Sequence, residues 1–435
     1  MIIGIGLRAR RRAFLAAAVG LCPLPAFAAD GPAAPGDIAW VLSASALVLF
    51  MTLPGLALFY GGLVRAKNLL SVLMHCFVVC CLVSLLWAVI GYSLAFDGDG
   101  AVLGGTGRAF LGGLSAAMPG NGLPEGVFAL FQMTFAVITP ALIIGAFPER
   151  VTFPFLLLFT ALWLLLVYIP VAHWVWGGGW LAGQGTIDFA GGIVVHTTAG
   201  VSALVVALMI GPRRGFPEIL QPPHSPGLTM AGAGMLWVGW FGFNGGSALA
   251  ASGTAAMAIL ATHLAACAAA LAWMALEWTR LGKPTSVGLV TGAVAGLATI
   301  TPASGYVGPM GGVAIGVAGG ALCFYATAFL KQRLRVDDTL DVFAVHGVGG
   351  MLGTFLAGIF VAAELGGAGY AAGMNLPLQL KAQLLGIVAA ALWSAAVTCA
   401  LALVLGASVG SRVDPEAEEE GLDLAAHGER AYETG

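Results

Sequence analysis

Two histidines stand inside long apolar stretches of this chain. His196 lies in DFAGGIVVHTTAG and His346 in DVFAVHGVGG, and each follows an acidic residue, Asp188 and Asp341 respectively. An imidazole can donate a hydrogen bond through one nitrogen and accept through the other, so two rings in contact can share a proton and line a path. For either residue alone, a membrane histidine satisfied by a neighbouring helix is the alternative. A metal site is weaker, because two imidazoles lack a third ligand.

Aromatic side chains form the second group of candidates. Phe131 and Phe135 are four residues apart and share one helix face, and WVWGGGW contributes Trp176. Tryptophan belts at membrane interfaces are common, but an aromatic cage for a small cation is the sharper hypothesis. A ring face attracts a partly desolvated cation by ~0.5–2 kcal/mol. The other members come from WFGFNGGSA: Trp240, Phe243 and Ser247, whose hydroxyl adds an acceptor.

The composition requires that these residues sit in a membrane. Of 435 residues, 59% are hydrophobic and 9% are charged, whereas a typical soluble domain has roughly 25% charged residues. The mean hydropathy is +0.94. Eleven apolar stretches of about 20 residues are long enough to span a bilayer. They centre near residues 49, 82, 136, 162, 202, 239, 265, 294, 320, 353 and 393.

The basic residues predict the orientation of these spans. Arg8 and Arg10 to Arg12 precede a short apolar run and Ala26-Phe27-Ala28, the pattern of a signal peptide over residues 1–28. An extra transmembrane helix there would need a longer apolar run. Of the 18 Lys and Arg residues, four lie in this signal and two, Arg108 and Lys381, in outer loops, so the other twelve lie inside. This positive-inside bias places the N-terminus outside and the C-terminus inside.

We therefore predict an all-α membrane protein with eleven transmembrane helices, a 5+5 inverted repeat plus a long eleventh helix. Because five is odd, a second five-helix unit enters the bilayer upside down, and such repeats place the substrate site near the midplane. The membrane domain covers residues 29–410. Residues 411–435 are polar and acidic, which is typical of a solvated, weakly structured tail or of a regulatory segment inside the cell. Gly312, Gly316 and Gly320 are spaced for close helix packing.

The apolar spans also limit the substrate. We expect no Lys, Arg, Asp or Glu at the middle of a span, and moving an intact ion into such a pore costs tens of kcal/mol by idealised estimates. One or two cation–π contacts do not offset this cost. A weakly acidic cation such as ammonium can release its proton first, whereas potassium and sodium cannot. Net charge −3 excludes nucleic-acid binding. The sequence shows no activated nucleophile, no carboxylate pair and no complete set of metal ligands. We therefore expect neither an enzyme nor a bound cofactor.

At these residues the chain resembles the ammonium transporter family, which includes methylammonium permeases and the more distant Rhesus proteins. The likeness runs from LVLFMTLPGLALFYGGLVRAKN (residues 47–68) to GLDLAAHGERAY (residues 421–432). Between them lie FQMTFAVITPALIIGAFPER, AHWVWGGGWLA, DFAGGIVVHTTAG, WFGFNGGSA, TPASGYVGP and VDDTLDVFAVHGVGG. Any one block would be weak evidence, but together they are specific.

The resemblance implies a role for each candidate residue. Asp188 matches a buried acidic position that holds helix-start groups, a role that an N-cap of the fifth span has on physical grounds as well. The remaining matches are an outer ammonium recruitment site (Phe131, Trp176, Ser247), a gate beneath it (Phe135, Phe243), twin pore histidines (His196, His346) and a pore-vestibule aromatic (Trp240).

The resemblance also implies partners and a location. We expect ammonium and methylammonium as substrates, a homotrimer with one pore per subunit, and a PII-type nitrogen signal protein at the cytoplasmic tail, in a bacterial inner membrane. An ammonium sensor with little transport is the alternative function. Some relatives of this fold carry a fused output domain, and we expect none here because the sequence ends at Gly435, which argues against the sensor. A Rhesus-like gas pore is the other alternative, against which Trp176 and Ser247 argue because it needs no cation cage.

Overall fold

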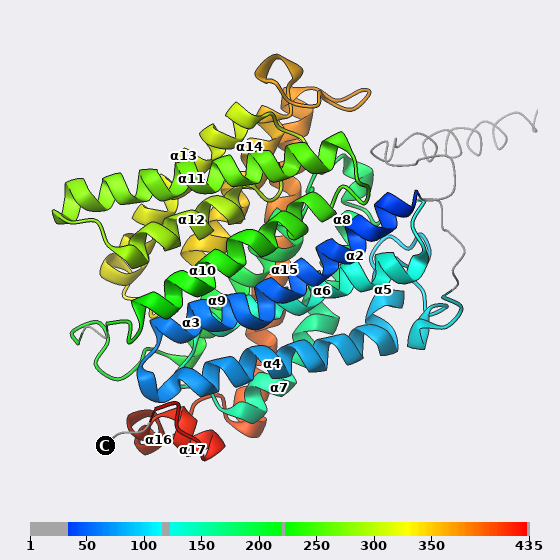
Figure 1. Cartoon of the computed structure of the whole chain (residues 1–435). Helices are drawn as coiled ribbons and strands as arrows, with labels where there is room; N and C mark the ends of the chain where they lie inside the picture. The colour runs from blue at the N-terminus through cyan, green and yellow to red at the C-terminus, as the bar shows by residue number, and fades with distance from the viewer. Residues whose placement is uncertain (1–33, 115–121, 220–221, 433–435) are drawn as a thin grey trace, which may run out of the picture.

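The protein is a bundle of helices (Figure 1), seen in a computed structural model that describes residues 34–114, 122–219 and 222–432. Within these ranges there is no β-strand, only an isolated bridge between Val151 and Arg412. The signal peptide expected over residues 1–28 lies outside the described residues.

Several of the long helices are interrupted by π-helical turns, and five pieces of the bundle come from residues 35–210. The first piece is α2 (Pro35–Phe50), η1 (Met51–Leu56) and α3 (Ala57–Leu63); the second is α4 (Leu69–Leu86), η3 (Trp87–Gly91) and α5 (Tyr92–Phe96); then follow α6 (Glu125–Ile143), α7 (Phe153–Trp163) with η6 (Leu164–Tyr168) and α8 (Ile169–Trp176), and η8 (Gly192–Thr197) with α9 (Thr198–Ile210).

The rest of the chain adds six further pieces and a helical tail. They are α10 (Pro226–Trp240) with η9 (Phe241–Gly245), α11 (Gly253–Leu281), α12 (Ser286–Ile300), α13 (Pro309–Ala328) with η10 (Phe329–Arg333), η11 (Phe343–Val348) with α14 (Gly349–Phe360), α15 (Leu376–Val409), and the short α16 (Pro415–Glu420) and α17 (Leu422–His427).

The expected all-helical membrane architecture is confirmed. Nine helices in the described part of the chain are long and apolar enough to cross a bilayer. All eleven predicted centres fall inside helices. Two of these centres, 239 and 294, lie in α10 and α12, which are not among the nine helices long enough to span a bilayer. The number of eleven spans therefore stays a prediction, as do the repeat and the orientation.

Glycines let neighbouring helices approach closely. On α13, Gly316 faces the backbone of Ala265 and Gly320 faces that of Ala269, both on α11. A side chain at Gly320 would place its Cβ only 2.5 Å from the Ala269 carbonyl oxygen. The packing role predicted from the glycine spacing is confirmed, and it fits the small-residue contacts by which membrane helices associate.

The C-terminal segment is folded against one end of the bundle, which we term the tail end (Figure 1). Leu422 donates its backbone N–H to Asn68 Oδ1 at 2.7 Å, and Asp423 accepts from two backbone N–H groups in the first turn of α4 at 2.7 and 3.1 Å. Glu418 pairs with Arg412 at 2.8 Å. A solvated, weakly structured tail is therefore wrong for residues 411–432, because its carboxylates cap and pair with groups of the bundle.

A fully buried arginine joins the loops at the tail end. Arg150 is 0% exposed and pairs with Asp337 at 3.9 Å, so burial lowers its pKa, to about 10, and Asp337 opposes that shift. Its guanidinium donates to five oxygens: Gly211 O (2.8 Å), Thr339 Oγ1 (2.7 Å), Asp337 O (2.8 Å), Ala146 O (3.1 Å) and Pro148 O (3.4 Å).

Two carboxylates extend this cluster of charges. Arg213 binds Asp337 at 2.9 Å and approaches Glu149 within 3.6 Å, and Arg65 binds Glu149 at 2.8 Å. Burial alone would raise the pKa of Asp337, but the Arg213 guanidinium holds it below its usual value. The network ties the loops after α3, α6 and α9 to the loop before η11.

Replacing Arg150 tests this network. We expect Arg150→Ala to lower stability by about 3–5 kcal/mol, because it removes a buried cation beside Asp337 and leaves four carbonyls and the Thr339 hydroxyl without this donor. Arg150→Lys should recover only part of the loss, since an ammonium lacks the planar fork of donors. Thermal unfolding in detergent measures the effect, with the exposed Arg333→Ala as control. Equal unfolding temperatures for the Arg150→Ala and Arg333→Ala proteins would contradict the structural role.

Candidate functional site

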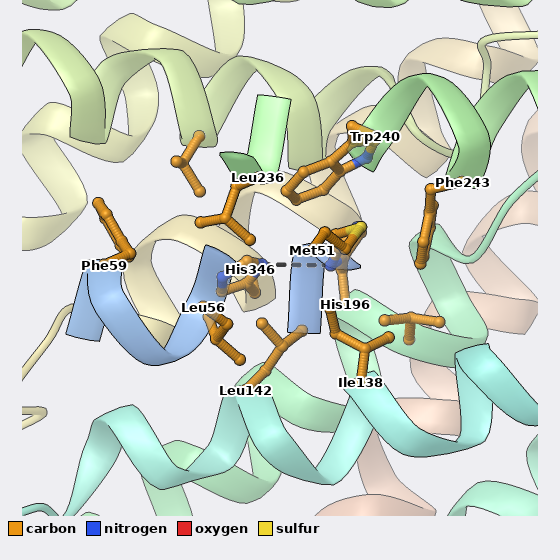
Figure 2. Close-up of a pocket in the computed structure, with 12 residues that line it drawn as sticks. Met51, Leu56, Phe59, Ile138, Leu142, His196, Leu236, Trp240, Phe243 and His346 are labelled. Carbon is orange, nitrogen blue, oxygen red and sulfur yellow. Dashed lines mark hydrogen bonds between the residues drawn. The ribbon is translucent and has the colours of Figure 1, made fainter. Parts of the chain in front are cut away.

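The two candidate histidines meet at the centre of the bundle (Figure 2). His196 Nδ1 and His346 Nδ1 are 3.2 Å apart, and the ring centroids are 5.1 Å apart with the planes tilted by 22°. One nitrogen must donate and the other accept, so two neutral rings here are opposite tautomers. His196 Nε2 is buried and has no hydrogen-bond partner among the described residues. The site therefore offers one free ring nitrogen on the His196 side of the pair.

Interrupted helices position both rings. Each histidine sits in a π-helical segment, His196 in η8 and His346 in η11, and single π-turns of this kind are frequent at functional sites. The His196 N–H bonds to the Gly191 carbonyl at 2.9 Å, five residues back. The two segments can cross because Gly200 and Gly347 meet backbone to backbone. A Cβ on Gly200, in α9 directly after η8, would meet the Gly347 backbone and force the two helices apart, which would separate the rings.

Asp188 holds the start of η8. One of its oxygens accepts from the N–H groups of Gly191 (2.9 Å) and Gly192 (2.6 Å), and the other from those of the next two residues at 2.8 and 3.1 Å. Burial raises the pKa of this carboxyl, and the four N–H groups act in the opposite direction. The Asp188 backbone carbonyl accepts from Trp176 Nε1 at 2.8 Å. Asp188 thus fixes both the helix that carries His196 and the aromatic candidate Trp176.

Asp338 has the same place before η11, which the sequence reasoning missed. Asp338 Oδ2 accepts from the Phe343 N–H at 2.7 Å, at the first residue of η11. Asp341, which the sequence analysis set beside Asp188, instead pairs with Lys331 at 2.8 Å. The available signal was spacing, because an aspartate stands eight residues before each histidine.

The aromatic candidates form a stack beside His196. The rings of Phe135 and Phe243 are 4.2 Å apart and tilted by 34°. Phe131 lies 5.0 Å from Phe135, and Trp176 lies 5.7 Å from it, both edge-on. Trp176 and Ser247 are partly exposed, whereas the three phenylalanines are buried. Ser247 Oγ donates to the Phe243 carbonyl at 2.9 Å, which leaves its lone pairs free to accept.

A narrow cavity runs past the histidines (Figure 2). Its free volume is about 10 Å³, room for about one molecule the size of water. Trp240 stacks 5.6 Å from His196 and donates through Nε1 to Thr301 at 2.8 Å. The polar atoms of the lining side chains are those of the two imidazoles and the Trp240 indole. The apolar lining residues are Met51, Leu56, Phe59, Ile138, Leu142, Val195, Leu236, Phe243 and Val294.

A larger cavity, which we term the vestibule, opens toward the tail end. It encloses about 470 Å³ and shares His346, Phe59 and Val294 with the narrow cavity. Its charged lining residues are Arg213, Arg214, Lys331, Arg335 and Asp341. No group of three or more His, Cys, Asp or Glu side chains within the described ranges could hold a metal ion.

The model of the Ammonium Transporter Family matches residues 39–432. The chain belongs to the ammonium transporter family. An ammonium transporter of Aquifex aeolicus is 46% identical over 94% of this chain and 96% of its own length. The matched range contains all the candidate site residues described above.

Solved members of the ammonium transporter family share the fold. A chain titled Sensor Amt Protein superposes with a TM-score of 0.85 at 32% identity, over 90% of this chain and 98% of its own. Mep2 of Saccharomyces cerevisiae gives a TM-score of 0.81 at 36% identity, over 89% of this chain and 91% of its own. With nine apolar helices long enough to span a bilayer among its described residues, this family member is a multi-pass membrane protein.

The Asp188 cap can be tested by stability. Asp188→Ala removes the acceptor of four buried N–H groups, and each unsatisfied group costs about 1–3 kcal/mol. We expect Asp188→Ala to unfold at a much lower temperature than the wild type, with Asp188→Asn in between because its one amide oxygen still accepts. The exposed Asp99→Ala serves as the matched control. A wild-type unfolding temperature for Asp188→Ala would show that these bonds do not hold η8.

Proposed function

We propose that this chain is an ammonium transporter that recruits ammonium at an aromatic cage, removes its proton and conducts ammonia through the histidine-lined cavity. One observation carries the proposal: a closed aromatic stack lies directly beside a cavity of about 10 Å³ whose polar lining is almost entirely the imidazole pair. Such a cavity admits a molecule of the size of ammonia but offers no replacement for the hydration shell of an ion.

Recruitment takes place at Trp176, Phe131 and Ser247. Trp176 is partly exposed and its indole is fixed by the bond to the Asp188 carbonyl, so its ring can face a cation without losing its own partner. Phe131 packs against Gly246, beside Ser247. Ring faces supply ~0.5–2 kcal/mol of attraction, and the Ser247 oxygen accepts a hydrogen bond. This attraction concentrates the cation at the stack without carrying it through.

At the Phe135–Phe243 gate, ammonium is deprotonated before it passes. The idealised cost of transferring an ion into an apolar medium is tens of kcal/mol, far above the cation–π attraction. Ammonium avoids this cost by giving a proton to water on the outer side of the gate, and neutral ammonia passes when the two rings move apart. Potassium and sodium have no proton to lose, so they stop at the gate.

The histidine pair guides ammonia and relays the proton. The buried His196 Nε2 accepts a hydrogen bond from the substrate when His196 carries its proton on Nδ1. That Nδ1–H donates to His346 Nδ1, which leaves the His346 proton on Nε2 and facing the vestibule. A proton entering at His196 therefore moves the two ring protons along by one place and releases one from His346.

We place the chain in a bacterial inner membrane as a homotrimer of eleven-span subunits built from inverted repeats, with the tail end in the cytoplasm. The charge pattern supports this orientation, because Arg65, Arg150, Arg213 and Arg412 all lie in the ion-pair network of the tail end. The packed tail there would receive a PII-type signal protein. A signal peptide over residues 1–28 would send the N-terminus outward.

A sensor with little transport is the weaker candidate. The solved chain titled Sensor Amt Protein shares the fold, so fold alone does not separate the two functions. The more identical curated relatives are named ammonium transporters, as in Aquifex aeolicus and, at 44% identity, Bacillus subtilis. Binding of ammonium by the purified chain in liposomes, with no flux, would favour the sensor.

The histidine pair gives the first test of transport. In proteoliposomes we expect an ammonium-evoked current from the wild type and none from potassium. Replacing both His196 and His346 by Ala should remove the selective current, because neither a relay nor a hydrogen-bonding path remains. His263→Ala, at an exposed histidine of α11, is the control and should keep the current. Full selective current in the double variant would refute the proposed role of the pair.

The cage gives a second test. Trp176→Leu removes the cation–π contact, worth ~0.5–2 kcal/mol, so the apparent KM for methylammonium uptake should rise about 2- to 30-fold with little change in the maximal rate. Trp278→Leu changes an exposed tryptophan of α11 and should leave KM unchanged. A lower maximal rate at constant KM would show that Trp176 acts in conduction and not in recruitment.

A further inference from the structure

A buried carboxyl at the tail end has no role in the mechanism above. Asp338 is 1% exposed, and its Oδ1 has no hydrogen-bond partner in the described part of the chain. A buried, unpaired carboxylate oxygen is costly, so such a group is normally protonated or hydrated. The next two residues, Thr339 and Leu340, line the vestibule into which His346 faces.

Asp188 shows what a purely structural carboxylate looks like in the same position. Both aspartates stand eight residues before a pore histidine, and both accept from the backbone at the start of its π-helical segment. In Asp188 both oxygens are occupied, each by two N–H groups. Asp338 Oδ1 is unoccupied. Asp338 therefore differs from Asp188 in having one oxygen, Oδ1, that can take up a proton.

The surroundings of Asp338 favour exchange of a proton near neutral pH. Burial raises the pKa of the Asp338 carboxyl to about 7, and Asp341 adds to the rise, while the Phe343 N–H, Lys331 and the Val342 N–H oppose it. Tyr60, which faces it from α3, already donates its hydroxyl to the Leu142 carbonyl at 3.0 Å. The neighbouring Asp337 is engaged by Arg150 and Arg213.

We infer that Asp338 is the proton acceptor that follows His346, an inference that rests on the proposed conduction of ammonia. The N–H bond at His346 Nε2 breaks, vestibule water carries the proton, and an O–H bond forms at Asp338 Oδ1. That O–H bond then gives its proton to water on the tail side. No electron moves, and each turnover returns the carboxylate. Because Oδ2 keeps its bond to the Phe343 N–H, the proton is taken up without releasing η11.

Asp338→Asn separates this role from capping. Asparagine keeps an oxygen for the Phe343 N–H but takes up no proton, and general acid–base groups contribute about 10²–10⁴-fold to rates. We expect the ammonium-evoked current of proteoliposomes to fall at least about tenfold with an unchanged unfolding temperature. Asp338→Glu should retain more current than Asp338→Asn. Asp99→Asn, at an exposed carboxylate, is the control and should stay near wild type.

The dependence on pH at the tail side gives a readout that a structural role would not change. Asp338 accepts a proton only as carboxylate, so wild-type current should fall as the tail-side pH drops through about 7. Asp338→Asn should lose this dependence. Wild-type current and pH profile in Asp338→Asn would overturn the inference while leaving conduction intact. Absence of current in the wild type would instead refute the proposed function, and with it this step.

Should Asp338→Asn fail to fold, the wild type and Asp338→Glu still decide the question. A wild-type current that is constant from pH 6 to pH 8 on the tail side would overturn the inference. A current that falls toward pH 6, with a midpoint displaced in Asp338→Glu and unmoved in the exposed Asp99→Glu, would support it, because changing the accepting group changes the pH at which it takes up the proton.

Discussion

The cost of charge in a medium of low polarity governs this structure. The cavity beside His196 has room for about one small molecule and almost no polar lining, so nothing in it replaces the water around an ion. The charged side chains of the ion-pair network lie at the tail end, where each is paired with a side chain of opposite charge. The polar side chains that line the cavity are the two histidines and Trp240, and a neutral imidazole donates and accepts without bringing a charge. A substrate that can become neutral is therefore the one that the geometry suits.

The same constraint explains how the pore helices are held. A broken helix in a membrane exposes backbone N–H groups that water does not reach, so each break needs an internal acceptor. Asp188 supplies four acceptor sites for η8 and Asp338 supplies one to η11. Glycine contacts then let the two segments cross. The histidine geometry is thus set by caps and close backbone packing, and the rings themselves contribute a single hydrogen bond.

The sequence predicted the helices, the two buried histidines as candidates and the packing glycines, because each depends on local patterns: apolar length, an imidazole in an apolar run, or a four-residue glycine spacing. No local pattern brings His196 and His346 together, because they are 150 residues apart. Their meeting was expected from the inverted arrangement of the spans and from the resemblance, and the contact between the rings agrees with it. Asp338 was missed because Asp341 is closer to His346 along the chain, while the cap depends on where η11 begins. The packed tail was misjudged since its acidic composition resembles that of a solvated segment, and its partners lie some 350 residues away.

One short loop connects these features. Residues 337–341 hold Asp337, which two arginines bind, then Asp338, which caps η11, and Asp341, which meets Lys331 in the vestibule. Arg150 also accepts the tail, since its carbonyl receives the Val413 N–H at 3.0 Å. The tail, the buried arginine and the helix of His346 are therefore joined by direct bonds, each with defined partners. A buried arginine with this many acceptors is rigid, so the loop that carries Asp338 is fixed from the side of the ion-pair network, and the free Oδ1 is the part of it that remains available for chemistry.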